Sequence, residues 1–229
     1  MLKRVLAMLL ILMTLCSTAF ATVEKGFTMY HGNREEKSIC ITIDDLADTE
    51  MVQAIFELGQ ELDVPMTFFV LGYVLKEEDA DLWRAIAESS CEIGNHTYAH
   101  QSLPDLGRSD IVRTLTRVQN RLDEILGYHY QMRVMRPPFG HINVDGSSYK
   151  VSHAVDEAGF ERMVLCDVSE LDPKKCYRQV QNGSILLFHS IKKDLECLKV
   201  LLPQLIEQGY NFVTVSEMAE LSIGTDTFH

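Results

Sequence analysis

Short apolar runs alternate along the chain with longer stretches in which apolar residues recur every three or four positions. The short runs are rich in β-branched and aromatic residues and predict seven strands, over residues 38–43, 66–71, 91–94, 132–135, 162–165, 184–188 and 211–215. The longer stretches have the helical period and predict helices over residues 49–62, 81–89, 109–126, 147–158 and 195–208. Gly127, Gly159 and Gly209 each follow one of these stretches, as helix stop signals commonly do.

Strands that alternate with helices are typical of a parallel sheet whose strands are joined by right-handed crossovers. The pattern therefore predicts an α/β fold, a distorted and incomplete (β/α) barrel with about seven parallel strands. An open doubly wound sheet is the alternative. No Gly/Ser/Pro-rich linker divides the 229 residues, so one main domain is expected over residues 37–218. Residues 22–36 are predicted to be an N-terminal extension and residues 219–229 a C-terminal tail.

The first 21 residues do not belong to this alternation. Lys3 and Arg4 precede an apolar run over residues 5–15, and a small-residue cleavage pattern of the A-x-A type ends at Ala21. This arrangement predicts a secretory signal peptide over residues 1–21, and hence a secreted or periplasmic protein. The apolar run is short for a membrane span, so no stable span is expected after cleavage.

The charge balance excludes one class of partner. The chain has 21 basic and 33 acidic residues, a formal net charge of −12, and loss of Lys3 and Arg4 with the signal peptide makes it more acidic. Nucleic-acid binding requires clustered Lys and Arg, so no nucleic-acid partner is expected. A neutral or cationic substrate approaches such a surface more easily than a polyanion does.

Six cysteines are present, and one of them lies within the predicted signal peptide. The remaining five are an odd number and include no C-x-x-C pair, so they give little support to a cysteine zinc site. Cys40, Cys91 and Cys166 lie in strand-like runs and are expected to be buried thiols. One disulfide remains possible in an oxidising compartment.

Residues with metal-binding and acid–base chemistry follow several of the predicted strands. In a parallel barrel the carboxyl ends of the strands share one face, and that face carries the chemistry. The polar groups that the strand ends bring to this face are Asp44-Asp45 after the first strand, His96 and His100 after the third, Arg136 after the fourth, Asp167 and Asp172 after the fifth, and His189 at the end of the sixth.

The two histidines and one carboxylate suggest a metal. Such a set is the usual group of protein ligands around a catalytic zinc ion, which keeps one position open for water. His96 and His100, four residues apart, would lie on one face of a helical turn. One residue of the Asp44-Asp45 pair would join them and the other would take a proton from water. Zn²⁺ is the favoured ion, although Co²⁺, Ni²⁺ or Fe²⁺ would also suit these ligands.

Two further residues fit a hydrolytic reaction. Arg136 precedes two prolines, which stiffen the loop, and its guanidinium could orient the base carboxylate and keep it ionised. His189 could protonate a leaving amine or alkoxide, because imidazole titrates in the useful range. Asp172 is expected to pair with His189 and to favour its protonated form, with Asp167 as the alternative partner.

These segments resemble the motifs of the polysaccharide deacetylases, the NodB-homology domain of carbohydrate esterase family four. Thr42-Ile43-Asp44-Asp45-Leu46 is similar to T-F-D-D-G, and His96-Thr97-Tyr98-Ala99-His100 is similar to H-[ST]-x-x-H. Arg136-Pro137-Pro138-Phe139-Gly140 is similar to R-x-P-[YF]-G, and Ile185-Leu186-Leu187-Phe188-His189 resembles L-x-x-x-H. The resemblance covers roughly residues 37–218.

The resemblance implies a role for each motif residue. Asp44 would be the general base and His189 the general acid, while Asp45, His96 and His100 would hold the metal. The groove would be lined by Pro138, Phe139 and Gly140. The implied activity is a metal-dependent removal of N-acetyl, or alternatively O-acetyl, groups from sugars of an extracytoplasmic glycan such as peptidoglycan or a chitin-type oligosaccharide.

The chain departs from the family pattern at two positions. Leu46 replaces the glycine after the Asp pair, so a different loop is expected there. Asp172-Pro173 stands where the family has Asp-Trp, so one aromatic wall of the groove is expected to be missing, because Trp83 lies in a helical stretch far from the motifs. A non-catalytic glycan-binding protein with the deacetylase fold is the alternative function. A metallopeptidase is disfavoured because H-E-x-x-H is absent, and a metallophosphoesterase because it would usually need a second metal and more ligands.

Overall fold

The computed structural model describes residues 27–144 and 146–223, so the predicted signal peptide lies outside the described residues. Eight strands form the sheet: β1 (Thr28–Met29), β2 (Ser38–Asp45), β3 (Met66–Val70), β4 (Glu92–Asn95), β5 (Val134–Met135), β6 (Arg162–Val164), β7 (Ile185–His189) and β8 (Asn211–Phe212). Their order is β1-β6-β5-β4-β3-β2-β7, and β8 pairs with the beginning of β2. Every pairing of these strands is parallel.

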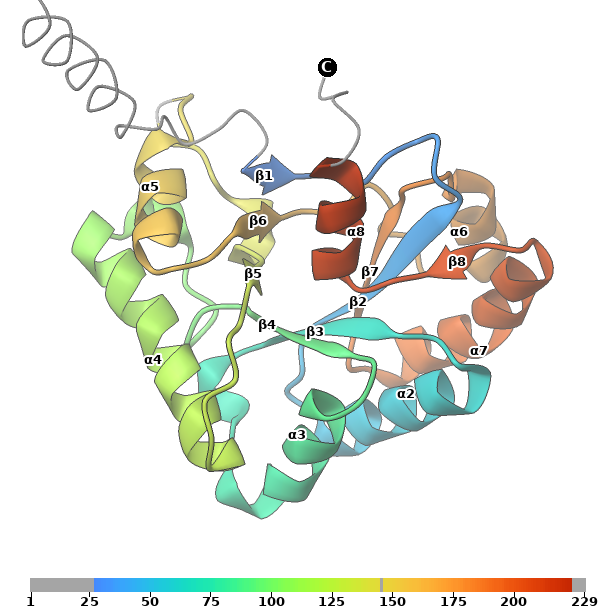
Figure 1. The fold of residues 1–229 in the computed structure, drawn as a ribbon, viewed down its shortest axis with the longest axis horizontal. Coiled ribbons are helices and arrows are strands. Elements are labelled where there is room, and N and C mark those ends of the chain that lie inside the picture. Colours follow the sequence, from blue (N-terminus) through green and yellow to red (C-terminus); the bar gives the residue numbers. More distant parts are fainter. Residues whose placement is uncertain (1–26, 145, 224–229) are drawn as a thin grey trace, which may run out of the picture.

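Helices surround the strongly curved sheet on its outer side (Figure 1). They are α2 (Thr49–Leu62), α3 (Ala80–Ala87), α4 (Arg108–Leu126), α5 (Tyr149–Glu157), α6 (Pro173–Gln179) and α7 (Lys192–Glu207), and α8 (Val215–Ile223) ends the described chain. Short 3₁₀ turns η1 (Gly72–Val74), η2 (Glu77–Asp79), η3 (Leu103–Asp105) and η4 (Pro138–Gly140) lie in the loops. None of the helices in the described part combines the length and apolar character needed to cross a bilayer.

The predicted α/β fold with a distorted, incomplete barrel of parallel strands is confirmed. The path of strands begins at β1 and ends at β7, which are not paired with each other in the described structure. The seam between them is narrowed where the Gly32 amide donates to the Gly183 carbonyl at 2.7 Å. Gly183 has φ 72°, and a Cβ there would lie 2.7 Å from the backbone of Gly32, so only glycine fits this close approach.

The alternation of side chains along β2 separates two apolar clusters. Ile39, Ile41 and Ile43 face the surrounding helices, where they join the main core. Cys40 faces inward and packs with Phe69 and with residues of β1, β5, β6, β7 and α8. The same alternation directs Thr42 and Asp44 to the inside of the barrel, near its carboxyl-terminal mouth.

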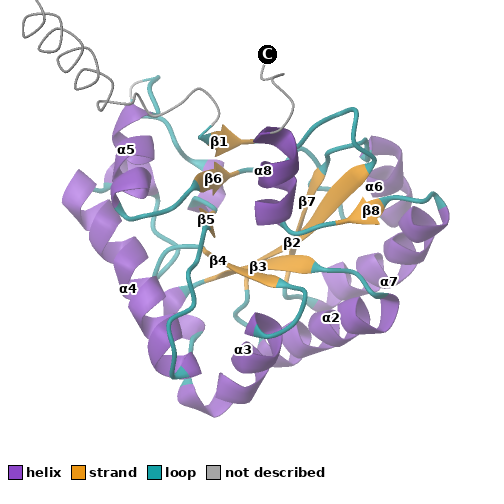
Figure 2. Cartoon of the chain, viewed as in Figure 1, coloured by secondary structure: helices purple, strands orange, loops and turns teal. Residues whose placement is uncertain are grey.

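Helix α8 closes the inside of the barrel at the opposite end. Ser216 in its first turn donates through its backbone N–H and its hydroxyl to the buried carboxylate of Glu92, and the Val215 amide donates to Thr67 at 3.0 Å. The strand predicted over residues 211–215 is therefore too long, because β8 ends at Phe212. Helix α8 continues through residues that were assigned to the C-terminal tail (Figure 2).

The five cysteines after the predicted signal peptide are all free thiols in the structure. Cys40 and Cys91 are buried, as expected, whereas Cys166 is only half-buried. Burial raises the pKa of all three thiols, so they remain protonated near neutral pH.

Candidate active site

A cavity of about 360 Å³ opens at the carboxyl ends of the strands. The residues that line it lie at or after the ends of six strands: Tyr30, Asp44, Asp45, His96, His100, Arg136, Pro137, Phe139, Gly140, Leu165, Cys166, Leu187 and His189. Six polar residues selected from the sequence thus meet in one cavity, because parallel strands direct their carboxyl ends to the same face.

Asp44 lies on the inner side of β2 and is almost completely buried. Its Oδ1 accepts from Nη1 of Arg136 at 2.8 Å, and the same nitrogen donates to Thr42 Oγ1 at 2.6 Å. Register pairing between β2 and β7 places Asp44 beside His189. Asp44 and His189, the predicted base and acid, therefore lie side by side in the wall of the cavity.

The guanidinium of Arg136 is fixed from several directions. Its Nη2 donates to the Leu165 carbonyl at 3.0 Å and its Nε to the Val164 carbonyl at 3.4 Å, and the group lies over the ring of Phe69. Only 3% of Arg136 is exposed, so its charge acts on Asp44 with little solvent screening. The predicted contact between this arginine and the aspartate is present in the structure.

Asp45, His96 and His100 form the one group in the described part of the chain whose carboxylate and imidazole atoms could hold a metal ion. Their ligand atoms all lie within 4.8 Å of one another. Asp45 Oδ1 is 3.5 Å from His96 Nε2 and 3.4 Å from His100 Nε2. The same oxygen is buried and has no hydrogen-bond partner among the described residues, which is costly unless a cation neutralises it.

The imidazole of His96 is oriented for metal binding. Its Nδ1 lies 2.8 Å from the backbone oxygen of Arg136, and a carbonyl oxygen can only accept. In the neutral ring the proton is therefore on Nδ1, which leaves the lone pair of Nε2 directed toward Asp45. A backbone carbonyl behind a histidine ligand is the usual way in which its tautomer and orientation are fixed.

The segment from His96 to His100 is a loop and not the helical turn that the i, i+4 spacing predicted. Thr97 has φ 70° and His100 has φ 55°, which are left-handed values. The Asn95 side chain stabilises this loop, because its Oδ1 accepts from the Thr97 amide at 2.9 Å and its Nδ2 donates to the Leu115 carbonyl at 3.0 Å. The loop still brings the two Nε2 atoms together, so the prediction of the ligand pair does not depend on a helix.

The electrostatics of Asp45 and His100 favour the forms that bind metals. The contact with His96 is the largest cause that lowers the pKa of Asp45, so this carboxylate stays ionised. Burial, followed by the neighbouring His96, lowers the pKa of His100 and favours its neutral form. One carboxylate and two imidazoles are a donor set that a zinc-type ion binds, so the residues fit such an ion.

His189 has a different carboxylate partner from the one predicted. Asp194, which is fully buried at the start of α7, accepts from the His189 backbone N–H at 2.6 Å, and its Oδ2 lies 3.5 Å from Nδ1 of the ring. Asp172 is exposed and caps α6, where its side chain accepts from the Lys175 amide. The interaction with Asp194 raises the pKa of His189.

Asp167, the alternative partner, is also used elsewhere. It forms an ion pair with Arg34 at 2.8 Å and accepts from the Ser184 hydroxyl and the Ile185 amide. These contacts tie the segment after β1 to the beginning of β7, across the seam of the barrel. The structure therefore gives Asp167 a place in barrel closure.

The two sequence departures have separate structural outcomes. Leu46 has φ 59°, a conformation that glycine adopts most easily, and its side chain is completely buried in the core. The backbone there thus keeps a glycine-like conformation, contrary to the different loop that was expected. Pro173 is the first residue of α6, and Trp83 is buried within the main core, so neither supplies an aromatic wall.

The loop from Arg136 to Gly140 provides part of the cavity wall. Phe139 has φ 62°, is 63% exposed, and makes an edge-to-face contact with the His100 ring at 4.5 Å. Phe139 and Gly140 line the cavity, as the resemblance implied. Pro138 is buried, and Pro137 lines the cavity in its place.

Two residues at the site, Asp194 behind His189 and Tyr30 in the cavity wall, were not predicted from the sequence. Asp194 lies in a Lys-Lys-Asp segment that looks like an ordinary first helical turn, and only its spacing of five residues from His189 connects it with the site. Tyr30 belongs to the region assigned to an extension, where the two-residue strand β1 leaves too short an apolar signal to detect.

The chain is similar in sequence to known proteins. The model of the polysaccharide deacetylase family matches residues 31–158, more than half of the chain. The chain is 25% identical over 217 residues to a peptidoglycan-N-acetylglucosamine deacetylase of Bacillus cereus, covering 90% of this chain and 76% of that protein. It is 28% identical over 192 residues to the peptidoglycan-N-acetylmuramic acid deacetylase PdaC of Bacillus subtilis, covering 81% of this chain but only 39% of PdaC.

A solved structure shows the same architecture. It is a mutant, with restored enzymatic activity, of a CE4 family pseudoenzyme from Bacillus anthracis. The match has a TM-score of 0.73 and 25% identity, and it covers 83% of this chain and 70% of that chain. The chain belongs to the polysaccharide deacetylase family, a family in which some members have lost activity.

Proposed function

We propose that the protein is a metal-dependent deacetylase that removes N-acetyl groups from the sugars of an extracytoplasmic glycan such as peptidoglycan. The observation that carries this proposal is the joint presence, in one cavity, of three candidate metal ligands, a buried carboxylate paired with Arg136, and a histidine paired with Asp194. The same groups would also hydrolyse an O-acetyl ester, which remains the alternative substrate.

Asp45, His96 and His100 would hold the metal. A divalent ion bound there would polarise the acetyl carbonyl and lower the pKa of a bound water. Zn²⁺ is the favoured ion, and Co²⁺, Ni²⁺ and Fe²⁺ suit the same ligands. The Nδ1 contact of His96 with the Arg136 carbonyl would keep this imidazole in place during turnover.

Asp44 would act as the general base. Its Oδ2 lies 3.8 Å from His96 Nε2, so the carboxylate borders the metal position without belonging to the candidate ligand group. Arg136 engages Oδ1, which leaves Oδ2 to accept a proton from the attacking water. The oxygen of this water would bond to the acetyl carbon as Asp44 takes the proton.

His189 would act as the general acid. The contact of Asp194 with Nδ1 leaves Nε2 to donate a proton to the sugar nitrogen as its bond to the acetyl carbon breaks. The raised pKa of His189 increases the fraction of protonated acid near neutral pH. The products would be acetate and a free amino sugar.

The proposed location outside the cytoplasm rests on two observations. The first 21 residues have the pattern of a secretory signal peptide. The two relatives from Bacillus cereus and Bacillus subtilis are named as peptidoglycan deacetylases, and peptidoglycan lies outside the cytoplasmic membrane.

Acetate release from defined glycans tests the proposal. The purified protein would be loaded with Zn²⁺ and incubated with N-acetylglucosamine oligosaccharides, peptidoglycan fragments and acetylated xylan, with a chelator-treated sample and Asp44→Asn as controls. We expect metal-dependent acetate release that Asp44→Asn lacks. Oligosaccharide binding without acetate release from any of these substrates would instead support a non-catalytic glycan-binding protein.

A further inference from the structure

Five large aromatic side chains are substantially exposed in the described part of the chain: Tyr30, Tyr73, Tyr128, Phe139 and Tyr149. Only Tyr30 and Phe139 among them line the candidate active-site cavity. Phe139 belongs to a motif implied by the family resemblance. Tyr30 belongs to no motif and has no role in the proposed hydrolysis, so its position requires a separate explanation.

Tyr30 is held at the mouth of the barrel by strand β1. Met29, the residue before it, pairs with Val164, and its carbonyl accepts from the Leu165 amide at 2.8 Å. The Leu165 carbonyl in turn accepts from Arg136, the partner of Asp44. Leu165 thus connects the backbone of Met29, the residue before Tyr30, with the guanidinium of Arg136.

The side chain of Tyr30 is placed for a ligand more than for the core. Half of Tyr30 is exposed, so the side chain is open to solvent at the cavity. It lines the cavity together with Leu165 and Cys166, whereas Phe139 contacts His100 beside the metal ligands. The cavity therefore has one aromatic side chain directly after β1 and another in η4.

Aromatic rings of this kind suit a sugar. A pyranose has an apolar face of C–H groups that packs on an aromatic ring, and tyrosine adds a hydroxyl at the edge of the contact. Tyrosine also offers a large contact area with only two side-chain torsions to fix. A cavity of about 360 Å³ lies at the lower end of the usual range for small-molecule sites and suits a single sugar unit.

We infer that Tyr30, the residue directly after β1, is a sugar-stacking residue that helps to determine glycan affinity, in place of the aromatic wall that is missing at Pro173. The inference rests on the proposed function for the identity of the ligand as an N-acetylated hexopyranose unit. Tyr30 holds the sugar ring and takes no part in proton transfer. Removal of the Tyr30 ring should therefore weaken the binding of the substrate and the binding of the transition state equally, which raises KM and leaves kcat unchanged.

Steady-state deacetylation of the N-acetylglucosamine tetrasaccharide by the Zn²⁺-loaded protein tests the role of Tyr30. For Tyr30→Ala we expect KM to rise about tenfold with kcat within about twofold of wild type. Tyr30→Trp should keep KM near the wild-type value, and Tyr30→Phe should raise it by no more than about threefold, because both retain the ring.

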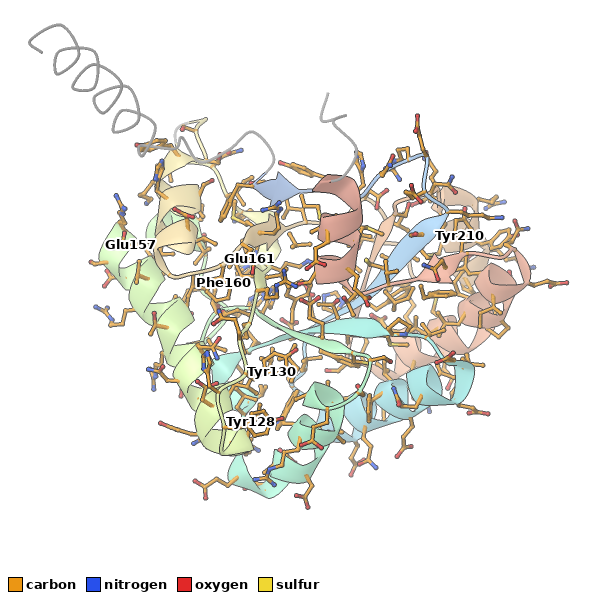
Figure 3. All side chains as sticks on the ribbon, in the orientation of Figure 1. Tyr128, Tyr130, Glu157, Phe160, Glu161 and Tyr210 are labelled. Atoms are coloured by element: carbon orange, nitrogen blue, oxygen red, sulfur yellow. The ribbon has the colours of Figure 1, made fainter. Side chains whose placement is uncertain are left out.

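Tyr128→Ala is the matched control, because Tyr128 is 41% exposed but follows the far end of α4 (Figure 3). It should leave KM and kcat unchanged. Thermal unfolding of each variant would show whether the fold is kept. A wild-type KM in Tyr30→Ala would overturn the inference and leave the proposed function intact. A raised KM in Tyr30→Ala that stays raised in Tyr30→Trp would have the same meaning.

Failure of the proposed function would be recognised separately. If the wild-type protein releases no acetate, calorimetric titration with the same tetrasaccharide replaces the kinetic assay. A tenfold weaker affinity in Tyr30→Ala, with Tyr30→Trp near wild type, would then support the stacking role without catalysis. Equal affinities, or no binding by the wild-type protein, would overturn the inference.

Discussion

The carboxylate of Asp194 accepts the backbone N–H of His189 at 2.6 Å, and the same oxygen lies 3.5 Å from Nδ1 of the imidazole. One carboxylate thus fixes both the backbone and the ring of the proposed acid. Its other oxygen is buried without a hydrogen-bond partner among the described residues. A buried oxygen without a hydrogen-bond partner lowers the stability of the fold. The position of Asp194 is therefore better explained by its contact with His189 than by a contribution to stability.

Replacing Asp194 with Asn should change the pH profile of turnover. The interaction with Asp194 raises the pKa of His189, so its loss should lower that pKa and deprotonate the acid at a lower pH. We expect the alkaline limb of the kcat profile to move to lower pH, so that less of the acid is protonated on that limb. Asp172→Asn should leave the limb unchanged, and a shift there would restore the pairing predicted from the sequence.

Asp44→Asn should separate base catalysis from metal binding. The amide cannot take a proton from water, so we expect kcat to fall by about 10²–10⁴. The metal content after dialysis, measured by mass spectrometry, should stay at the wild-type value because Asp44 is not one of the three candidate ligands. Near-normal turnover would assign the base to another residue.

His100→Ala should remove the metal as well as the activity. The variant keeps only Asp45 and His96, and two ligands hold a zinc-type ion poorly. We expect the metal content after dialysis to fall to a small fraction of the wild-type value. His153→Ala is the matched control, because His153 contacts Tyr149 on α5 and is not a candidate ligand. Full metal retention in His100→Ala would rule out the proposed ligand set.

Arg136→Met should destabilise the fold as well as inactivate the protein. Removal of the guanidinium leaves the carboxylate of Asp44 buried without its partner. Such a loss typically lowers the free energy of unfolding by about 3–5 kcal/mol. Urea unfolding of the single variants and of Arg136→Met with Asp44→Asn would measure the coupling. We expect the double variant to recover part of the loss, and strict additivity would show that the two side chains do not interact.

Strong periodic signals in the sequence predicted most of the fold. Helix α2 occupies the predicted residues 49–62, and β2 extends the predicted strand by only two residues. The misses were the short elements β1, α6 and α8. Two strand residues or a seven-residue helix carry too few apolar positions to show a period, and the long-range contacts of these elements determine their form.

The site residues that lie at the carboxyl ends of strands could be predicted from the sequence. Parallel strands bring their carboxyl ends together, so Asp44, His96 and His189 could be grouped from the sequence alone. The partner of His189 could not be predicted, because Asp172 and Asp194 both lie near helix starts and their backbone directions decide which one faces inward. The loop geometry at Thr97 was missed because left-handed residues other than glycine leave no local signal.

The guanidinium of Arg136 links three strands that are far apart in the sequence. Arg136 is the residue directly after β5. Its guanidinium donates to Thr42 and Asp44 on β2 and to the carbonyls of Val164 and Leu165 at the end of β6. The proposed base therefore acquires its partner only when these distant segments have assembled. During refolding from denaturant, hydrolytic competence should appear late, after the helical circular-dichroism signal has recovered, because the contacts that create it join residues up to 94 positions apart in the chain.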